Sequence, residues 1–175
     1  MTRSPEAGLY VAQLEWLLMQ LHDALGHIPE GMLGWAPHEG ANPARVIARH
    51  AMAVTSVYVL GFGCGADAFM ERDRAAEFLD QPRDPSPAHG HELSAAHYAL
   101  LDLIGDIRRH LEPLTEADMA RTCIPPQHLW GTGAPRQISA REAIVEAIRH
   151  GAIHLGELRL TMELAQRAQA DGGRA

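Results

Sequence analysis

Two histidines near the end of the chain, His150 and His154, are four residues apart. The segment around them repeats its apolar residues at helical spacing, so it is predicted to be a helix. At 3.6 residues per turn, the two imidazoles then lie about 40° apart on one face, one turn above the other. Two imidazoles in this arrangement can bind one metal ion. A chain with eleven histidines also produces such pairs by chance, so two partly exposed helix histidines remain the alternative.

Two further histidines, His50 and His97, fall on the apolar stripes of other predicted helices. Facing helices of a bundle build metal sites from inward side chains of this kind. A single inward histidine is more often a hydrogen-bonded core residue. Several of them from different helices are costly to bury unless something takes up their hydrogen bonds. These positions therefore favour a metal site.

Other catalytic motifs are missing from the sequence. All fifteen basic residues are arginine, which excludes Schiff-base and P-loop lysines. No Glu-x-x-His, Cys-x-x-Cys or Gly-x-Ser-x-Gly motif occurs, so carboxylate di-iron, cysteine-rich zinc and serine hydrolase sites are not indicated. Cys64 and Cys123 are too few for a disulfide framework, and we interpret them as small buried residues.

The charge balance limits the partners. The chain has 15 basic and 22 acidic residues, a formal net charge of −7. This excess of acid disfavours nucleic acid, whose phosphates require a basic surface, and anionic membranes. The N-terminus lacks the apolar core of a secretory signal, and the longest charge-free apolar stretch, 51–66, is short for a membrane span. We predict a cytoplasmic protein without nucleic-acid or membrane partners.

Four segments have the apolar periodicity of helices: about 5–27, 43–60, 89–111 and 139–170. We expect Ser4 and Asn42 to cap the first two, and Ser139 with Glu142 to form a capping box on the fourth.

The connections between these helices are long. The segment 64–88 contains several prolines, so the helices that it joins need not be antiparallel neighbours. Residues 122–138 are predicted to be a loop. The pattern predicts an all-α fold, a four-helix bundle with long crossover connections. We expect a single domain over 1–175, with the last few residues disordered.

Two segments resemble the DinB-like (YfiT-like) superfamily of metal-binding four-helix bundles. One is the run from Leu33 to His50, in which Trp35, Pro37 and a Gly-x-Asn lead into a helix with an inward histidine. The other is His150-Gly-Ala-Ile-His154-Leu-Gly156, which is similar to the family's His-x-x-x-His-x-Gly ending. The segments cover roughly a fifth of the chain, in the family's order and spacing.

The resemblance implies a metal held by three side chains, which here are His50, His150 and His154. Three neutral imidazoles leave an open coordination position for water or substrate. Zn²⁺ is the first expectation, and imidazole also suits Ni²⁺, Fe²⁺ and Co²⁺. The resemblance further implies a homodimer.

Family members with known activity use low-molecular-weight thiols. They include bacillithiol S-transferases and the mycothiol-dependent maleylpyruvate isomerase. The resemblance therefore implies a metal-dependent thiol S-transferase, or a related enzyme such as a hydrolase, in which a thiolate attacks an electrophilic substrate. The alternatives are a non-catalytic metal- or ligand-binding, stress-related dimeric bundle, and a bundle without metal.

Three residues near the predicted site are candidates for a catalytic or supporting role. Glu146 can accept a hydrogen bond from a ligand imidazole, but an ion pair with Arg149 or Arg141 is the alternative that we favour. His97 is either a proton-transfer group or a core histidine. Arg159 either binds a substrate carboxylate or is solvated.

Loop and glycine positions complete the set of candidates. His128 and Trp130 lie in the 122–138 segment, which is a candidate mouth of the site. Trp35 is expected to pack beneath its loop. Gly156 costs about 1 kcal/mol in a helix interior relative to alanine, so we expect another segment to approach it closely.

Overall fold

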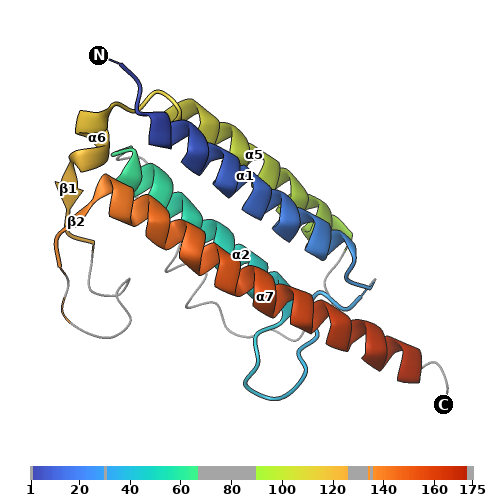
Figure 1. Cartoon of the computed structure of the whole chain (residues 1–175). Helices are drawn as coiled ribbons and strands as arrows, with labels where there is room; N and C mark the ends of the chain where they lie inside the picture. The colour runs from blue at the N-terminus through green and yellow to red at the C-terminus, as the bar shows by residue number, and fades with distance from the viewer. Residues whose placement is uncertain (1, 30, 67–89, 126–133, 135, 173–175) are drawn as a thin grey trace.

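The computed structural model describes residues 2–29, 31–66, 90–125, 134 and 136–172. The described part is mostly helical, so the predicted all-α class is confirmed (Figure 1). The elements are α1 (Pro5–Gly26), α2 (Ala44–Thr55), the π-helix η1 (Ser56–Gly63), α5 (Gly90–Leu111), α6 (Glu116–Ala120), β1 (Thr122–Cys123), β2 (Ile138–Ser139) and α7 (Ala140–Gly172).

Side-chain contacts show that α1 and α7 run parallel. Arg141 bonds Glu6 near the start of both helices, and Gln166 donates to the carbonyl of His27 near their ends. The helices lie side by side over this length (Figure 1).

The other two long helices run in the opposite direction. Along α2 and η1, His50 meets His154 whereas Gly63 packs against Ile144, so this helix is antiparallel to α7. Along α5, Arg108 bonds Glu15 and His97 meets His22, so α5 is antiparallel to α1. The helices that flank the 64–88 segment are therefore parallel to each other, which agrees with a crossover between them (Figure 1).

The core lies between these four helices. Its largest fully buried side chains are leucines and isoleucines of the predicted apolar stripes together with one methionine: Leu14, Leu17, Leu18, Leu21, Leu25, Leu60, Leu100, Ile107, Leu111, Met119, Ile144 and Leu158. Ala44–Gly63 is long and apolar enough to span a membrane by composition, but 78% of its most apolar window is buried inside the protein. Within the described part of the chain, this segment is therefore buried as a core helix is.

The second helix continues from Ser56 as the π-helix η1, which the apolar pattern did not predict and whose eight residues are all buried. It ends at Gly63, among the glycines that follow the predicted apolar stripe. The Arg121 guanidinium donates to the carbonyls of Phe62 and Gly63, which satisfies acceptors at the end of this helix. Gly65 follows with a φ of 69°, a value that favours glycine.

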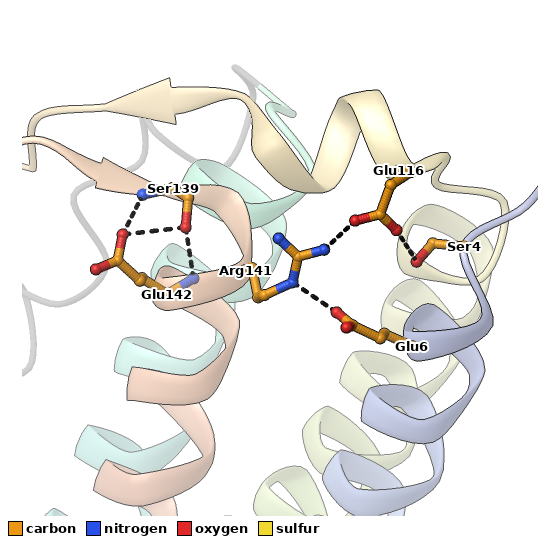
Figure 2. Close-up of polar contacts among 6 residues, drawn as sticks. All are labelled: Ser4, Glu6, Glu116, Ser139, Arg141 and Glu142. Atoms are coloured by element: carbon orange, nitrogen blue, oxygen red, sulfur yellow. Dashed lines mark hydrogen bonds and ion pairs between the residues drawn. The ribbon is translucent and has the colours of Figure 1, made fainter.

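Polar contacts join α1, α6 and α7 at one end of the bundle (Figure 2). Arg141 bonds Glu6 and Glu116, and the Ser4 hydroxyl donates to Glu116 over 3.0 Å. The predicted capping box at the start of α7 is confirmed, because Ser139 and Glu142 exchange side-chain and backbone hydrogen bonds.

One predicted cap and one predicted loop are corrected, and a second cap is confirmed in its position only. Ser4 occupies the N-cap position of α1, but its side chain makes no capping bond, and its hydroxyl donates to Glu116. The N-cap position of α2 is Pro43 rather than Asn42. The ends of the 122–138 segment pair as a short antiparallel sheet, Thr122 with Ser139 and Cys123 with Ile138. The predicted disorder of the last few residues lies mostly outside the described part, although α7 itself reaches Gly172.

Candidate metal centre

Three imidazoles meet between α2 and α7. The Nε2 atom of His150 lies 3.2 Å from Nε2 of His50 and 3.1 Å from Nε2 of His154. Each of the three residues has a ring nitrogen that lies within 4.8 Å of a ring nitrogen of both others. Among the described residues, this is the one group of three or more potential metal-ligating side chains that meets this distance.

The helices explain why these side chains converge. His150 and His154 project from successive turns of α7, as their spacing predicts. His50 lies on the face of α2 that packs against α7, and all three side chains are partly buried. The resemblance placed the same three histidines in one site, and the structure brings them together.

The donor set fits a transition-metal ion. A tetrahedral ion with Zn–N bonds of 2.0–2.1 Å needs ligand nitrogens about 3.3 Å apart. The two short Nε2 separations, 3.1 and 3.2 Å, are close to this requirement. Without an ion, the His150 Nε2 atom carries either one proton or one lone pair, so it can form a hydrogen bond with one of its two neighbouring imidazole nitrogens but not with both.

Burial keeps the imidazoles of His50 and His150 neutral. Desolvation, followed by the charges of His154 and His50, lowers the pKa of His150 from 6.5 to about 4. Desolvation and then His154 also lower the pKa of His50. At neutral pH both rings are therefore uncharged, and one nitrogen of each has a lone pair for a metal.

A carboxylate fixes the third imidazole. The Nδ1–H of His154 donates to Oε2 of Glu157 over 2.5 Å, which leaves the lone pair on Nε2, the atom that faces His150. Glu157 was not among the residues predicted from the sequence. The available signal was its position one turn after His154 on the same helix. The Nδ1 atoms of His50 and His150 are buried without a partner in the described part of the chain.

Replacing Glu157 by alanine is expected to weaken metal binding by about 10–100-fold, the usual effect of removing such a supporting carboxylate. The measurement is competition with a chromophoric chelator. Glu163→Ala is the matched control, because Glu163 is an exposed glutamate of the same helix that pairs with Arg167. Equal affinities of the two variants would contradict a role for Glu157 at the centre.

The three weaker candidates bond other residues than the clustered histidines, although the charge of Glu146 acts on His150. Glu146 pairs with Arg149, the alternative that we favoured. Arg159 bonds Gln20 of α1. His97 packs against His22, between α1 and α5. None of the three has a hydrogen bond or ring contact with the cluster among the interactions of the described residues.

The loops near the predicted site are described only in part. Trp35 is partly buried, whereas His128, Trp130 and most of the 64–88 segment lie outside the described residues. Within the described part, a cavity of about 280 Å³ is lined by Leu25, Leu33, Arg45, Ala48, Arg49, Met52, Ala95, Ala96 and Ala99. None of the three clustered histidines lines it.

Neither cysteine is an activated nucleophile. Burial raises the pKa of the Cys64 thiol to about 12, only partly opposed by the charge of Arg121. Burial also raises the pKa of Cys123. Both thiols therefore stay protonated at neutral pH, and the thiolate is the reactive form.

In a Cys123→Ser background, Cys64 is expected to react with iodoacetamide at pH 8 more than about 100-fold more slowly than free cysteine. The rate is followed by mass spectrometry. The same protein unfolded in guanidinium chloride is the control and should react at the rate of free cysteine. A folded rate close to the unfolded rate would show that the thiol is accessible and ionised.

Comparison with known proteins gives one family. The sequence model of the DinB superfamily matches residues 13–158 of the chain, which include all three clustered histidines and Glu157. A search of curated proteins finds no match to the chain.

Proposed function

Because the chain belongs to the DinB superfamily and gathers three imidazoles between two of its helices, we propose that it is a metal-dependent thiol S-transferase. The metal is a divalent transition ion, Zn²⁺ or Ni²⁺, held by His50, His150 and His154. The observation that supports the proposal best is the convergence of three imidazoles, with the Nε2 atom of His150 at separations from those of His50 and His154 that suit such an ion.

The nucleophilic thiol comes from outside the chain. Both cysteines of the sequence have a raised pKa, so neither supplies a thiolate at neutral pH. A low-molecular-weight thiol of the bacillithiol or mycothiol type fits this requirement. Three protein ligands leave a coordination position open for it.

The residues of the site prepare a neutral donor set. His150 and His50 have lowered pKa values, and Glu157 keeps the proton of His154 on Nδ1. When bound, the ion supplies Lewis-acid chemistry that favours ionisation of a thiol. In the reaction that we propose, the thiol proton passes to solvent, the sulfur bonds to an electrophilic carbon, and the leaving group departs with its bonding electrons. The reaction needs neither an oxidant nor a reductant.

The test is a transferase assay with 1-chloro-2,4-dinitrobenzene, in which a C–S bond replaces the C–Cl bond and chloride leaves. Protein loaded with one equivalent of Zn²⁺ or Ni²⁺ is combined with bacillithiol or mycothiol. We expect a rate above the uncatalysed reaction that is lost in metal-free protein and in His154→Ala. Absence of turnover and of thiol binding with every metal–thiol pair would overturn the proposal.

The second candidate is the non-catalytic, stress-related bundle that binds a metal or ligand. It also requires the three-histidine centre, so metal content does not separate the two functions. Thiol binding to the metal-loaded protein without turnover would favour it, because the open position would then exchange ligands without chemistry.

We propose further that the protein is a cytoplasmic homodimer that binds neither nucleic acid nor membranes. The net charge of −7 supports the absence of anionic partners. Sedimentation equilibrium tests the dimer, and a single species at the monomer mass over the accessible concentration range would contradict it.

A further inference from the structure

A second pair of histidines lies outside the three-histidine cluster. His22 of α1 and His97 of α5 face each other across the antiparallel α1–α5 contact, with ring centroids 4.1 Å apart and ring planes at 67°. The family match covers both positions, but the residues that carry the resemblance include neither. The pair therefore needs its own physical explanation.

The two rings are as close as the rings of the candidate metal centre. Ring centroids in that cluster are 4.3, 4.7 and 4.9 Å apart, and its ring pairs are also tilted, at 59–90°. The His22 and His97 rings are thus as close and as tilted as the rings of that cluster, although they come from a different pair of helices.

The nitrogens of the pair are poorly satisfied. The Nδ1 atoms of His22 and His97 are both buried without a hydrogen-bond partner in the described part of the chain. Leaving a buried polar atom unpaired costs free energy, and here two such atoms occur in adjacent rings. A metal ion would use one nitrogen of each ring.

The local charge also suits a cation. The Asp23 carboxylate lies 3.6 Å from Nδ1 of His22, and within the described interactions no arginine pairs with it. The last turn of α1, which contains Asp23, also presents the negative end of the helix dipole. Among the described interactions, the charged side chain next to the pair is therefore the Asp23 carboxylate.

From these contacts we propose a second site for a late divalent transition metal, with His22 and His97 as protein ligands and Asp23 as the adjacent anion. Imidazole suits Cu²⁺, Ni²⁺ and Zn²⁺. Two ligands bind more weakly than three, so this site fills after the centre formed by His50, His150 and His154. A metal here links α1 to α5 and does not depend on the proposed transferase function.

The experiment is a Zn²⁺ titration by calorimetry, combined with metal analysis after gel filtration, on four proteins. The unchanged protein should bind two equivalents and His97→Gln one. His150→Ala/His154→Ala, which leaves a single histidine at the first centre, should also bind one, and the variant with all three changes none. If the three-histidine centre does not bind metal, His150→Ala/His154→Ala binds as much as the unchanged protein while His97→Gln still loses one equivalent. The two hypotheses are thus tested separately.

Folding and nonspecific binding are controlled in the same series. His22→Gln should lose the same equivalent as His97→Gln, and far-UV circular dichroism checks that both variants are folded. His38→Ala, which removes an exposed loop histidine, should keep both equivalents. If folded His22→Gln and His97→Gln bind as much Zn²⁺ as the unchanged protein, the second site does not exist.

Discussion

Replacing His150 by alanine is expected to weaken metal binding at the candidate centre by more than about 100-fold, beyond the range for a supporting residue. His150 is the middle imidazole, because its Nε2 atom lies within 3.2 Å of the Nε2 atoms of both His50 and His154. Its removal takes away one of three ligands and separates the remaining two. The dissociation constant is measured by chelator competition.

The same variant should separate metal-dependent stability from intrinsic stability. A metal present at 100 times its dissociation constant stabilises the folded state by about 2.7 kcal/mol. If the affinity falls 100-fold, the same metal concentration contributes only about 0.4 kcal/mol. The melting temperature of His150→Ala should therefore lose most of its rise with added Zn²⁺ but change little in the presence of a chelator.

His38→Ala is the matched control for this comparison, because His38 is exposed in the loop before α2 and its one hydrogen bond among the described residues is to the carbonyl of Glu39. Its melting temperature should rise with Zn²⁺ as much as that of the unchanged protein. An equal rise for His150→Ala would show that the three imidazoles do not bind the ion that stabilises the fold.

The parts of the fold predicted correctly are those that local sequence determines. The apolar stripe around Ile144 and Leu158 needs only helical periodicity, and the capping box of Ser139 and Glu142 needs only residues three apart. The pair His150 and His154 was visible for the same reason. Its third partner, His50, was assigned through the family resemblance, because spacing within one segment does not reveal that α2 packs against α7.

The failures involve distant partners or missing patterns. Ser4 has the sequence of an N-cap, but its hydroxyl bonds Glu116, which is 112 residues away. The π-helix η1 is buried on all sides, so its apolar residues form no stripe from which a change in helical period can be detected. Glu157 was overlooked because its position one turn after His154 becomes informative only once the His154 ring is placed against it.

Gly156 is a further correction, and Gly151 shows where the predicted close approach occurs. A Cβ atom built on Gly156 meets nothing within 4 Å, so no described segment approaches it. A Cβ atom on Gly151 would lie 2.5 Å from Cδ2 of Leu17. Gly151 is buried next to His150, and its missing side chain lets α1 pack closely against α7.

The two glycines form a matched pair for a stability prediction. Alanine is favoured over glycine in a helix by about 1 kcal/mol, so Gly156→Ala is expected to raise the free energy of unfolding by about this amount. Gly151→Ala gains the same helical preference but forces Leu17, a fully buried side chain, to move. Overpacking of this kind typically costs about 1–3 kcal/mol. Gly151→Ala should therefore be about 1–3 kcal/mol less stable than Gly156→Ala.

Urea unfolding in the presence of a chelator measures this difference without a contribution from metal binding. The helical preference cancels between the two variants, so what remains is the cost of moving Leu17. A Leu17→Ala change made in the Gly151→Ala background isolates that contact: its cost should be smaller than in the unchanged protein, because it also relieves the overlap. Equal stabilities of the two glycine variants would mean that Leu17 moves aside freely and that the α1–α7 contact does not depend on Gly151.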